Sequence, residues 1–223
     1  MAIQASSPED LIIFDKAYLD RVTNRRKILK ENTTKVAGAL PEGIPALHET
    51  WTYLLSEYLP MRYPTMFSLS EDRATFQNHI TNISLPTTPP EDPHTALQAL
   101  GETVEDDMFL LVETPEGHRA VALFSPNDLH IYDGDKVEEC ENVDISKACL
   151  RQELQTLTRL PETGAILFSF KTYLTPIEQI KKEGFGPELA DAIEGLKHGN
   201  APDMWVYKGA VRWGKSVCEY LRS

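Results

Sequence analysis

The sequence of 223 residues is poor in cysteine and lacks both a leader pattern and a long apolar run. Its three cysteines, Cys140, Cys149 and Cys218, include no C-x-x-C pair. This odd number without that spacing argues against a disulfide framework or a zinc knuckle and favours a reducing compartment. Residues 1–10 have no basic or apolar leader region, and no apolar run approaches the roughly 18 residues of a membrane span. We therefore expect a cytoplasmic protein without a membrane partner.

Positive charge is also scarce. There are 22 Lys and Arg residues against 34 Asp and Glu residues, so the net charge is −12. This balance argues against a nucleic-acid partner, because nucleic-acid binders usually present a basic surface. The apolar content of 41% is ordinary for a globular protein, and a chain of this length can bury a sizeable core. We expect one domain over residues 1–223.

Common catalytic motifs are missing as well. The sequence has no phosphate-binding loop, dinucleotide fingerprint, nucleophile elbow or H-E-x-x-H zinc motif. Gly184-Phe185-Gly186 is followed by Pro187, which rules out a dinucleotide turn. No catalytic residue can therefore be assigned from motifs.

The most informative stretch is residues 149–176. It contains two runs with alternating side chains, joined by Leu160-Pro161-Glu162-Thr163-Gly164. Proline presets one turn dihedral and glycine tolerates positive φ, so the link predicts a hairpin turn. A helix is the alternative for the first run, because its leucines also recur at helical spacing. We favour the hairpin.

Antiparallel pairing about this turn predicts an apolar face, with Leu154 near Phe170 and Thr156 near Phe168. The opposite face would be polar. Its predicted neighbours are Glu153 with Lys171, Arg151 with Tyr173, and Gln155 with Ser169. Two interpretations of this polar face stay open: a solvated outer surface, or a wall that faces a ligand.

The rest of the chain predicts an α+β fold with an antiparallel sheet and flanking helices. The basic cluster Arg25-Arg26-Lys27 is expected on a solvated helix face, and residues 65–93 show no clear element. Helices are expected over residues 15–32, 46–59, 175–183 (with Thr175 as N-cap) and 187–197, a further helix begins near 92–95, and one more helical turn is expected in the tail. Strands are expected over residues 108–112 and 120–124, with short ones at 129–132 and 204–207.

The run from Leu150 to Tyr173 resembles the signature of the haem-dependent oxidative N-demethylase family. The family pattern is L-R-x-E-R-Q-T-L-x-R-L-P, followed by a turn and a strand that ends in R-T-Y or K-T-Y. Leu154 stands where many members have arginine. The matching residues are Leu150, Arg151, Glu153, Gln155, Thr156, Leu157, Arg159, Leu160, Pro161, Gly164, Phe168, Thr172 and Tyr173. The resemblance spans nearly the whole chain and is greatest to the filamentous-fungal branch.

This resemblance implies a PAS-like α+β domain that carries haem b. Characterised members use dioxygen, with electrons from a separate reductase, to remove a methyl group from a small amine as formaldehyde. The implied activity is that of an iron-containing monooxygenase, an oxidoreductase.

Haem binding requires an apolar slot, an axial ligand and cations for the propionates. The residues that the resemblance offers for cofactor binding are Arg151, Gln155, Arg159, Lys171 and Tyr173. His130 is the first choice for the iron ligand, ahead of His118, and Cys149 is a further alternative. The catalytic residues remain unassigned.

One departure from the family pattern concerns the middle of the chain. Typical members carry a further segment, several tens of residues long, that commonly contains a His-x-Pro-Val-Pro motif. Here Phe124-Ser125-Pro126 runs almost directly into His130. We therefore expect a domain shortened between residues 126 and 130. The alternatives to an active enzyme are a non-catalytic PAS-like binding or interaction module, an inactive truncated relative, or a chain that does not fold stably. The substrate, the electron donor and the oligomeric state stay open.

Overall fold

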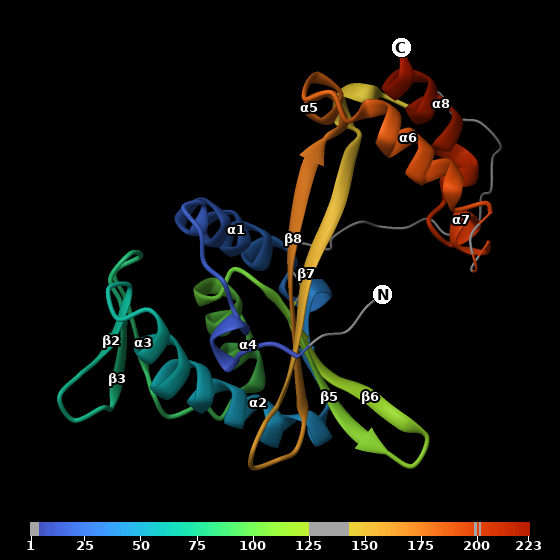
Figure 1. Ribbon diagram of the computed structural model, residues 1–223. Helices are drawn as coiled ribbons and strands as arrows, with labels where there is room; N and C mark the ends of the chain where they lie inside the picture. Colours follow the sequence, from blue (N-terminus) through green and yellow to red (C-terminus); the bar gives the residue numbers. More distant parts are fainter. Residues whose placement is uncertain (1–4, 125–142, 199, 201) are drawn as a thin grey trace. The chain divides into compact units, whose positions relative to one another are not determined.

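The computed structural model describes residues 5–124, 143–198, 200 and 202–223 (Figure 1). His130 and the short strand expected at residues 129–132 lie outside these residues. Contacts divide the chain into two compact units. The larger unit comprises residues 1–130 and 154–171, and the smaller unit comprises residues 131–153 and 172–223. The single domain expected over the whole chain stays a prediction.

The α+β class with antiparallel sheets is confirmed. A five-stranded sheet has the order β1-β6-β5-β8-β7, and β8 pairs antiparallel with β5. The strands are β1 (Ala37–Ala39), β5 (Asp107–Thr114), β6 (Gly117–Phe124), β7 (Cys149–Arg159) and β8 (Ile166–Pro176). The specific likeness to a PAS domain stays a prediction.

A second, three-stranded sheet corrects the expectation that residues 65–93 hold no element. It consists of β2 (Phe67–Leu69), β3 (Thr75–Asn78) and β4 (Ile83–Pro86). Arg73 and Asn82, both with φ of 57°, stand in the two connecting turns. Strands of three or four residues are too short to show an alternating pattern, and this explains why the sequence did not reveal them.

Helices make up the rest of the larger unit. Within the part of the chain that the structure describes, no helix is long and apolar enough to cross a membrane. The helices are α1 (Tyr18–Val36), α2 (Ile44–Thr52), the π-helical turn η3 (Tyr53–Tyr58), α3 (Leu59–Arg62) and α4 (Pro93–Thr103). Short 3₁₀ turns occur at η1 (Pro8–Asp10), η2 (Pro41–Gly43) and, in the smaller unit, η4 (Ile145–Lys147).

The helices of the smaller unit correct three expectations. The smaller unit contains α5 (Ile177–Lys182), α6 (Gly186–Gly195), α7 (Met204–Tyr207) and α8 (Ala210–Arg222). The strand expected at residues 204–207 is the helical turn α7, which packs against α8. The N-cap of α5 is Pro176 instead of Thr175, because β8 continues through Pro176. The tail forms a full amphipathic helix instead of a single turn.

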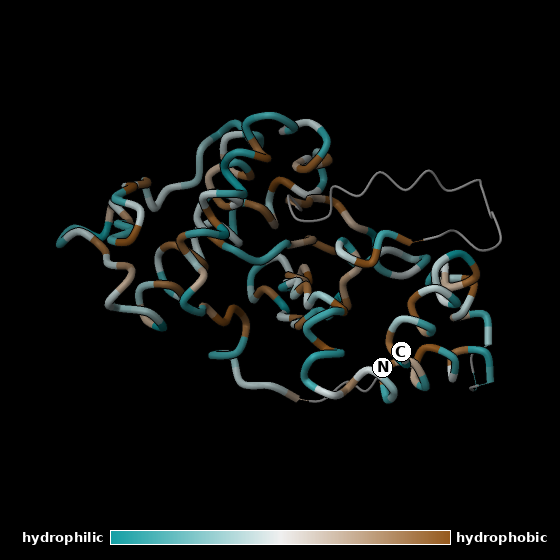
Figure 2. Tube along the Cα trace, turned by 90° about the horizontal axis from the view of Figure 1, so that it is seen from above, coloured by the Kyte–Doolittle hydropathy of each residue, from teal (hydrophilic) through white to brown (hydrophobic). Residues whose placement is uncertain are grey.

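Each unit has its own core. In the larger unit Trp51 and Leu47 of α2 and Leu97 of α4 belong to one cluster with Met108 and Leu167 of the sheet. The smaller unit has a separate cluster, formed by Ile177, Ala190, Val217, Cys218 and Leu221. Figure 2 shows apolar stretches alternating with hydrophilic ones along the helices, as amphipathic packing requires.

The hairpin over residues 149–176 is confirmed, and the helical alternative for its first run is wrong. Its turn is closed by a 2.8 Å hydrogen bond from the Leu160 amide to the Ala165 carbonyl. Buried Glu49 of α2 accepts hydrogen bonds from the amides of Glu162 (2.6 Å) and Thr163 (2.8 Å) and from the Thr163 hydroxyl. A carboxylate on α2 therefore holds the turn in place.

Candidate functional site

The predicted cofactor residue Lys171 belongs to a group of charged side chains in the larger unit. The group is buried except at Arg21 and Asp15, whose side chains are 28% and 37% exposed. Side chains alternate along a strand, so Ser169 and Lys171 share one face of β8. Both are buried, at 0% and 1% exposure. We call this group the charged cluster; it consists of Asp15, Arg21, Arg25, Glu105, Asp106, Asp107, Ser169 and Lys171. Of the two interpretations of the polar face, a solvated surface is therefore wrong for these two β8 positions.

Lys171 is held by three oxygens from distant parts of the larger unit. Its Nζ bonds to Glu105, to Asp15 Oδ2 at 3.1 Å and to the Ile13 carbonyl at 2.7 Å. Burial acts to lower the pKa of the ammonium, but the hydrogen bond and charge of Glu105 outweigh it, and the pKa of Lys171 is raised. The ammonium is therefore charged and serves as a link between β8 and the segments that precede α1 and β5.

Arg25 is also fully buried, so the expectation of a solvated basic cluster is wrong for this residue. Arg26 is half-buried, and Lys27 is exposed as expected. Arg25 Nη1 lies 2.5 Å from Asp107 Oδ1, while Nε and Nη2 each donate to a backbone carbonyl at 3.0 Å, those of Gly101 and Asp106. The physical reason is that α1 packs against α4. This packing directs the guanidinium onto the end of α4 and the first residue of β5.

Asp106 is a buried carboxyl of the charged cluster whose pKa is raised. Its Oδ2 accepts a 2.9 Å hydrogen bond from the Ser169 hydroxyl, whereas its buried Oδ1 has no hydrogen-bond partner among the described residues. Burial raises the pKa of Asp106 to about 6, although Ser169 and Lys171 act the other way. This carboxyl can therefore take up and release a proton near neutral pH.

The acidic run at residues 105–107 gives no evidence of a metal centre. Within residues 5–124, 143–198, 200 and 202–223, no group of three or more His, Cys, Asp or Glu side chains is arranged to hold a metal ion. Its carboxylates bind Lys171, Ser169 and Arg25 instead.

The other face of β5 and β8 carries three phenylalanine rings, which we call the phenylalanine face. Phe109 pairs directly with Phe168, and Phe170 follows on the same side of β8. The ring centroids lie 5.4 to 6.3 Å apart, within the range of favourable aromatic contacts. None of these described rings belongs to either core cluster, and Phe109 and Phe168 stay partly exposed.

Sequence reasoning missed Phe109 as part of this surface, although the strand over residues 108–112 was expected. The alternation of side chains along residues 108–112 was a signal that could have placed Phe109 on one face of its strand. The sequence did not show that this strand pairs with β8. The prediction that the apolar face of the hairpin is buried is confirmed for Phe170, which is 5% exposed. It is wrong for Leu154, which is 41% exposed. β7 is the edge strand of the sheet, so fewer neighbours cover its side chains.

The remaining predicted cofactor residues are divided between the two units. Arg151 is exposed in the smaller unit and forms a 2.5 Å ion pair with Glu153. Gln155 and Arg159 are exposed in the larger unit, with Arg159 beside Gly164 at the hairpin turn. Tyr173 is half-buried in the smaller unit. Their shared role in binding a cofactor stays a prediction.

The predicted iron ligands have different surroundings. His130, the first choice, lies outside the described residues. His118 is exposed on β6 next to the β5–β6 turn, and Cys149 is exposed at the start of β7.

Comparison with protein-family models identifies a family that matches this chain. The family described as "Haem-dependent oxidative N-demethylase, alpha subunit-like" matches residues 2–128 and residues 120–218. The two matched segments together extend from residue 2 to residue 218 and overlap at residues 120–128.

Proposed function

Because the chain belongs to the haem-dependent oxidative N-demethylase, alpha subunit-like family, we propose that it binds haem b and removes a methyl group from a small amine. The reaction would consume dioxygen, and a separate reductase would supply the electrons. The observation that carries this proposal is the family match over nearly the whole chain. Bound haem would supply the dioxygen chemistry, while the chain would bind and orient the cofactor and the amine.

The phenylalanine face offers a wall for a haem macrocycle in the larger unit. A porphyrin is a flat apolar ring, and stacked aromatic side chains outside the two core clusters offer a matching apolar wall. Phe109 and Phe168 would contact the ring, while Phe170 packs against both of them on the same face. Among the predicted cations of this unit, Arg159 is exposed and has no ion pair within the described residues, so it could reach a propionate.

Lys171 and Ser169, with their partners Glu105 and Asp106, would then act from behind this wall. Lys171 and Ser169 point away from the face that carries Phe168 and Phe170, because side chains alternate along β8. Their bonds to Glu105 and Asp106 fasten β8 to the start of β5. We propose that the cluster fixes the two strands that carry the rings, and that Lys171 acts as a positioning residue.

The overlap of the two matched segments supports a shortened member of the family. The match divides at residues 120–128, next to the place where the sequence predicts a missing segment. We place this shortened chain in the filamentous-fungal branch, on the resemblance of residues 150–173. The axial ligand is proposed to be His130, with His118 and Cys149 as the alternatives.

A second candidate function is a non-catalytic binding module of the same family. The observation that favours it is the division of the family match at residues 120–128, next to the place where the sequence predicts a missing segment. A binding site that lacks part of its wall would favour a role in binding over catalysis.

The decisive experiment is a haem titration of the purified chain, monitored by absorbance. We expect a saturable Soret band with one haem per chain, and formaldehyde from dimethylamine once a reductase is added. Phe168→Leu should weaken haem binding, whereas Phe185→Leu, at a 60% exposed ring of the smaller unit, should leave it unchanged. Absence of a Soret band during titration would overturn the proposal. A Soret band without formaldehyde would favour the binding module.

A further inference from the structure

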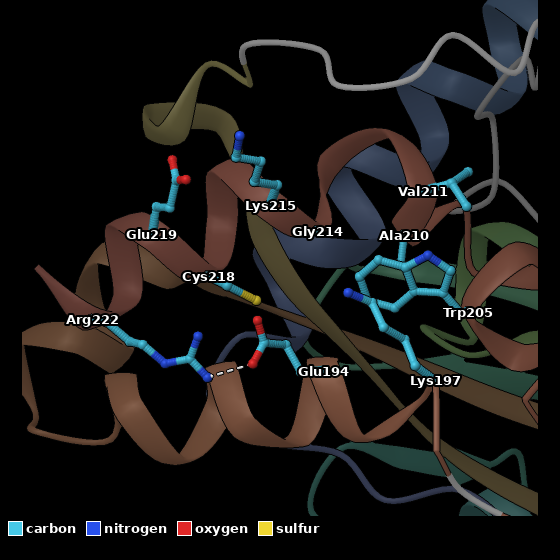
Figure 3. A pocket seen from close by; sticks show the side chains of 10 residues that line it. All are labelled: Glu194, Lys197, Trp205, Ala210, Val211, Gly214, Lys215, Cys218, Glu219 and Arg222. Atoms are coloured by element: carbon cyan, nitrogen blue, oxygen red, sulfur yellow. Dashed lines mark hydrogen bonds and ion pairs between the residues drawn. The ribbon is translucent and has the colours of Figure 1, made fainter.

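The smaller unit contains a cavity that the proposed haem function does not use. It lies between α6, α7 and α8 and has a volume of about 450 Å³, within the range of small-molecule sites (Figure 3). The side chains that define it are those of Glu194, Lys197, Trp205, Cys218 and Arg222.

The cavity has an apolar wall that depends on one glycine. Gly214 of α8 is buried, and a Cβ atom at this position would collide with the indole of Trp205. The missing side chain lets the indole lie directly against the helix backbone. Ala210 and the buried thiol of Cys218 continue the wall along α8. Burial raises the pKa of the Cys218 thiol, so this group stays neutral at physiological pH.

Most charges around the cavity already have partners. Arg222 Nη2 binds Asp191 Oδ1 at 2.7 Å and Glu194 Oε2 at 2.8 Å. The hydrogen bond from Arg222 lowers the pKa of Glu194, which therefore stays ionised and paired. Two further lining residues, Lys215 and Glu219, extend away from Cys218 and Glu194 in Figure 3 and carry opposite charges.

Lys197 is the lining cation that lies against the apolar wall. Its Nζ lies 4.2 Å from the centroid of the Trp205 ring, and it forms no ion pair within the described residues. Figure 3 shows its amine beside the indole, facing the space that Cys218 and Glu194 also face.

We propose that this cavity binds a small organic monoanion with an apolar body, namely an aryl or short alkyl carboxylate. The carboxylate would pair with Lys197 Nζ, and the apolar body would lie against Trp205, Ala210 and Cys218. This inference rests on the described residues that line the cavity and does not depend on haem binding.

The test is a ¹⁹F NMR titration of the full chain with 4-fluorobenzoate. We expect a saturable shift of the fluorine resonance, with competition by hexanoate and no saturable binding of 4-fluorobenzylamine. Lys197→Ala should weaken binding at least fivefold, and Lys197→Arg should stay within about threefold of the natural chain. Lys208→Ala is the matched control, because Lys208 stacks on Tyr207 and does not line the cavity.

A second variant tests the wall independently of charge. Gly214→Ala should displace the indole and abolish binding of 4-fluorobenzoate, and circular dichroism will show whether the helices persist. The proposal is overturned if 4-fluorobenzoate gives no saturable shift with the natural chain. It is equally overturned if the benzylamine binds as well as the benzoate, or if Lys197→Ala and Lys208→Ala have the same effect.

Discussion

Two groups of ion pairs in this protein differ in their surroundings. In the larger unit Arg25 and Asp107 are at most 1% exposed, as are Lys171 and Glu105. In the smaller unit the Arg222 side chain is 39% exposed while it bridges Asp191 and Glu194. Water screens the second group, whereas each charge of the first depends on its partner. Ion pairs with similar distances are therefore expected to contribute very differently to the free energy of unfolding.

The largest effect is expected at Arg25. Arg25→Met leaves the Asp107 carboxylate buried without its cation and removes hydrogen bonds to two backbone carbonyls. We expect a loss of about 3–5 kcal/mol in the free energy of unfolding of the larger unit, measured by urea titration. Lys27→Met, at an exposed position of the same helix, is the control and should change the free energy by less than about 0.5 kcal/mol. Equal losses for both variants would contradict the buried pairing.

A somewhat smaller effect is expected at Lys171. Lys171→Met removes the nearer of the two cations that pair with Glu105 and leaves Arg21, whose Nε lies 3.7 Å from Oε2. The Glu105 carboxyl can also respond by taking up a proton. We expect a loss of about 2–3 kcal/mol near neutral pH, below the full cost of breaking a buried pair. The deficit should shrink as the pH falls toward 5, because protonation then neutralises Glu105. Urea titrations at pH 5 and pH 8 will show this trend, with exposed Lys182→Met as the control.

These buried pairs also show how far the sequence alone could lead. The hairpin at residues 149–176 was predictable because alternation and turn residues are local signals. The burial of Arg25 was not, because its partner Asp107 is 82 positions away and both lie in runs of charged residues. The three-residue strand at Phe67–Leu69 was too short to detect. The cavity beside Trp205 depends on a contact across helices, at Gly214, that no spacing rule encodes.

Asp106 offers a third, pH-dependent test of the charged cluster. Its pKa is about 6 in the folded chain against an ordinary value of 3.8, so the folded state binds more protons between these values. Its contribution to stability is therefore complete below pH 3.8 and is lost as the pH rises through about 6. Asp106→Asn removes this dependence and should gain about 2–3 kcal/mol relative to the natural chain between pH 4.5 and pH 7.5.

The measurement for Asp106 is the free energy of unfolding of both chains at each pH. Asp72→Asn serves as the control, because Asp72 is exposed and hydrogen bonds from the Ser70 hydroxyl and the Ala74 amide lower its pKa, which therefore lies below this window. Asp106→Asn could instead change the free energy of unfolding by the same amount at pH 4.5 and at pH 7.5. This result would show that the Asp106 carboxyl is not forced to ionise in a buried site.

The smallest effect on stability is expected at Arg222, and this prediction separates stability from binding. Arg222→Gln removes an exposed ion pair, so the midpoint of thermal unfolding should stay unchanged within error. The same substitution frees the Glu194 carboxylate at the wall of the cavity, where it would repel a bound anion and offset the charge of Lys197. We therefore expect weaker binding of 4-fluorobenzoate without a loss of stability. An unfolding midpoint lowered as far as that of Arg25→Met would show that exposure does not distinguish the two groups of ion pairs.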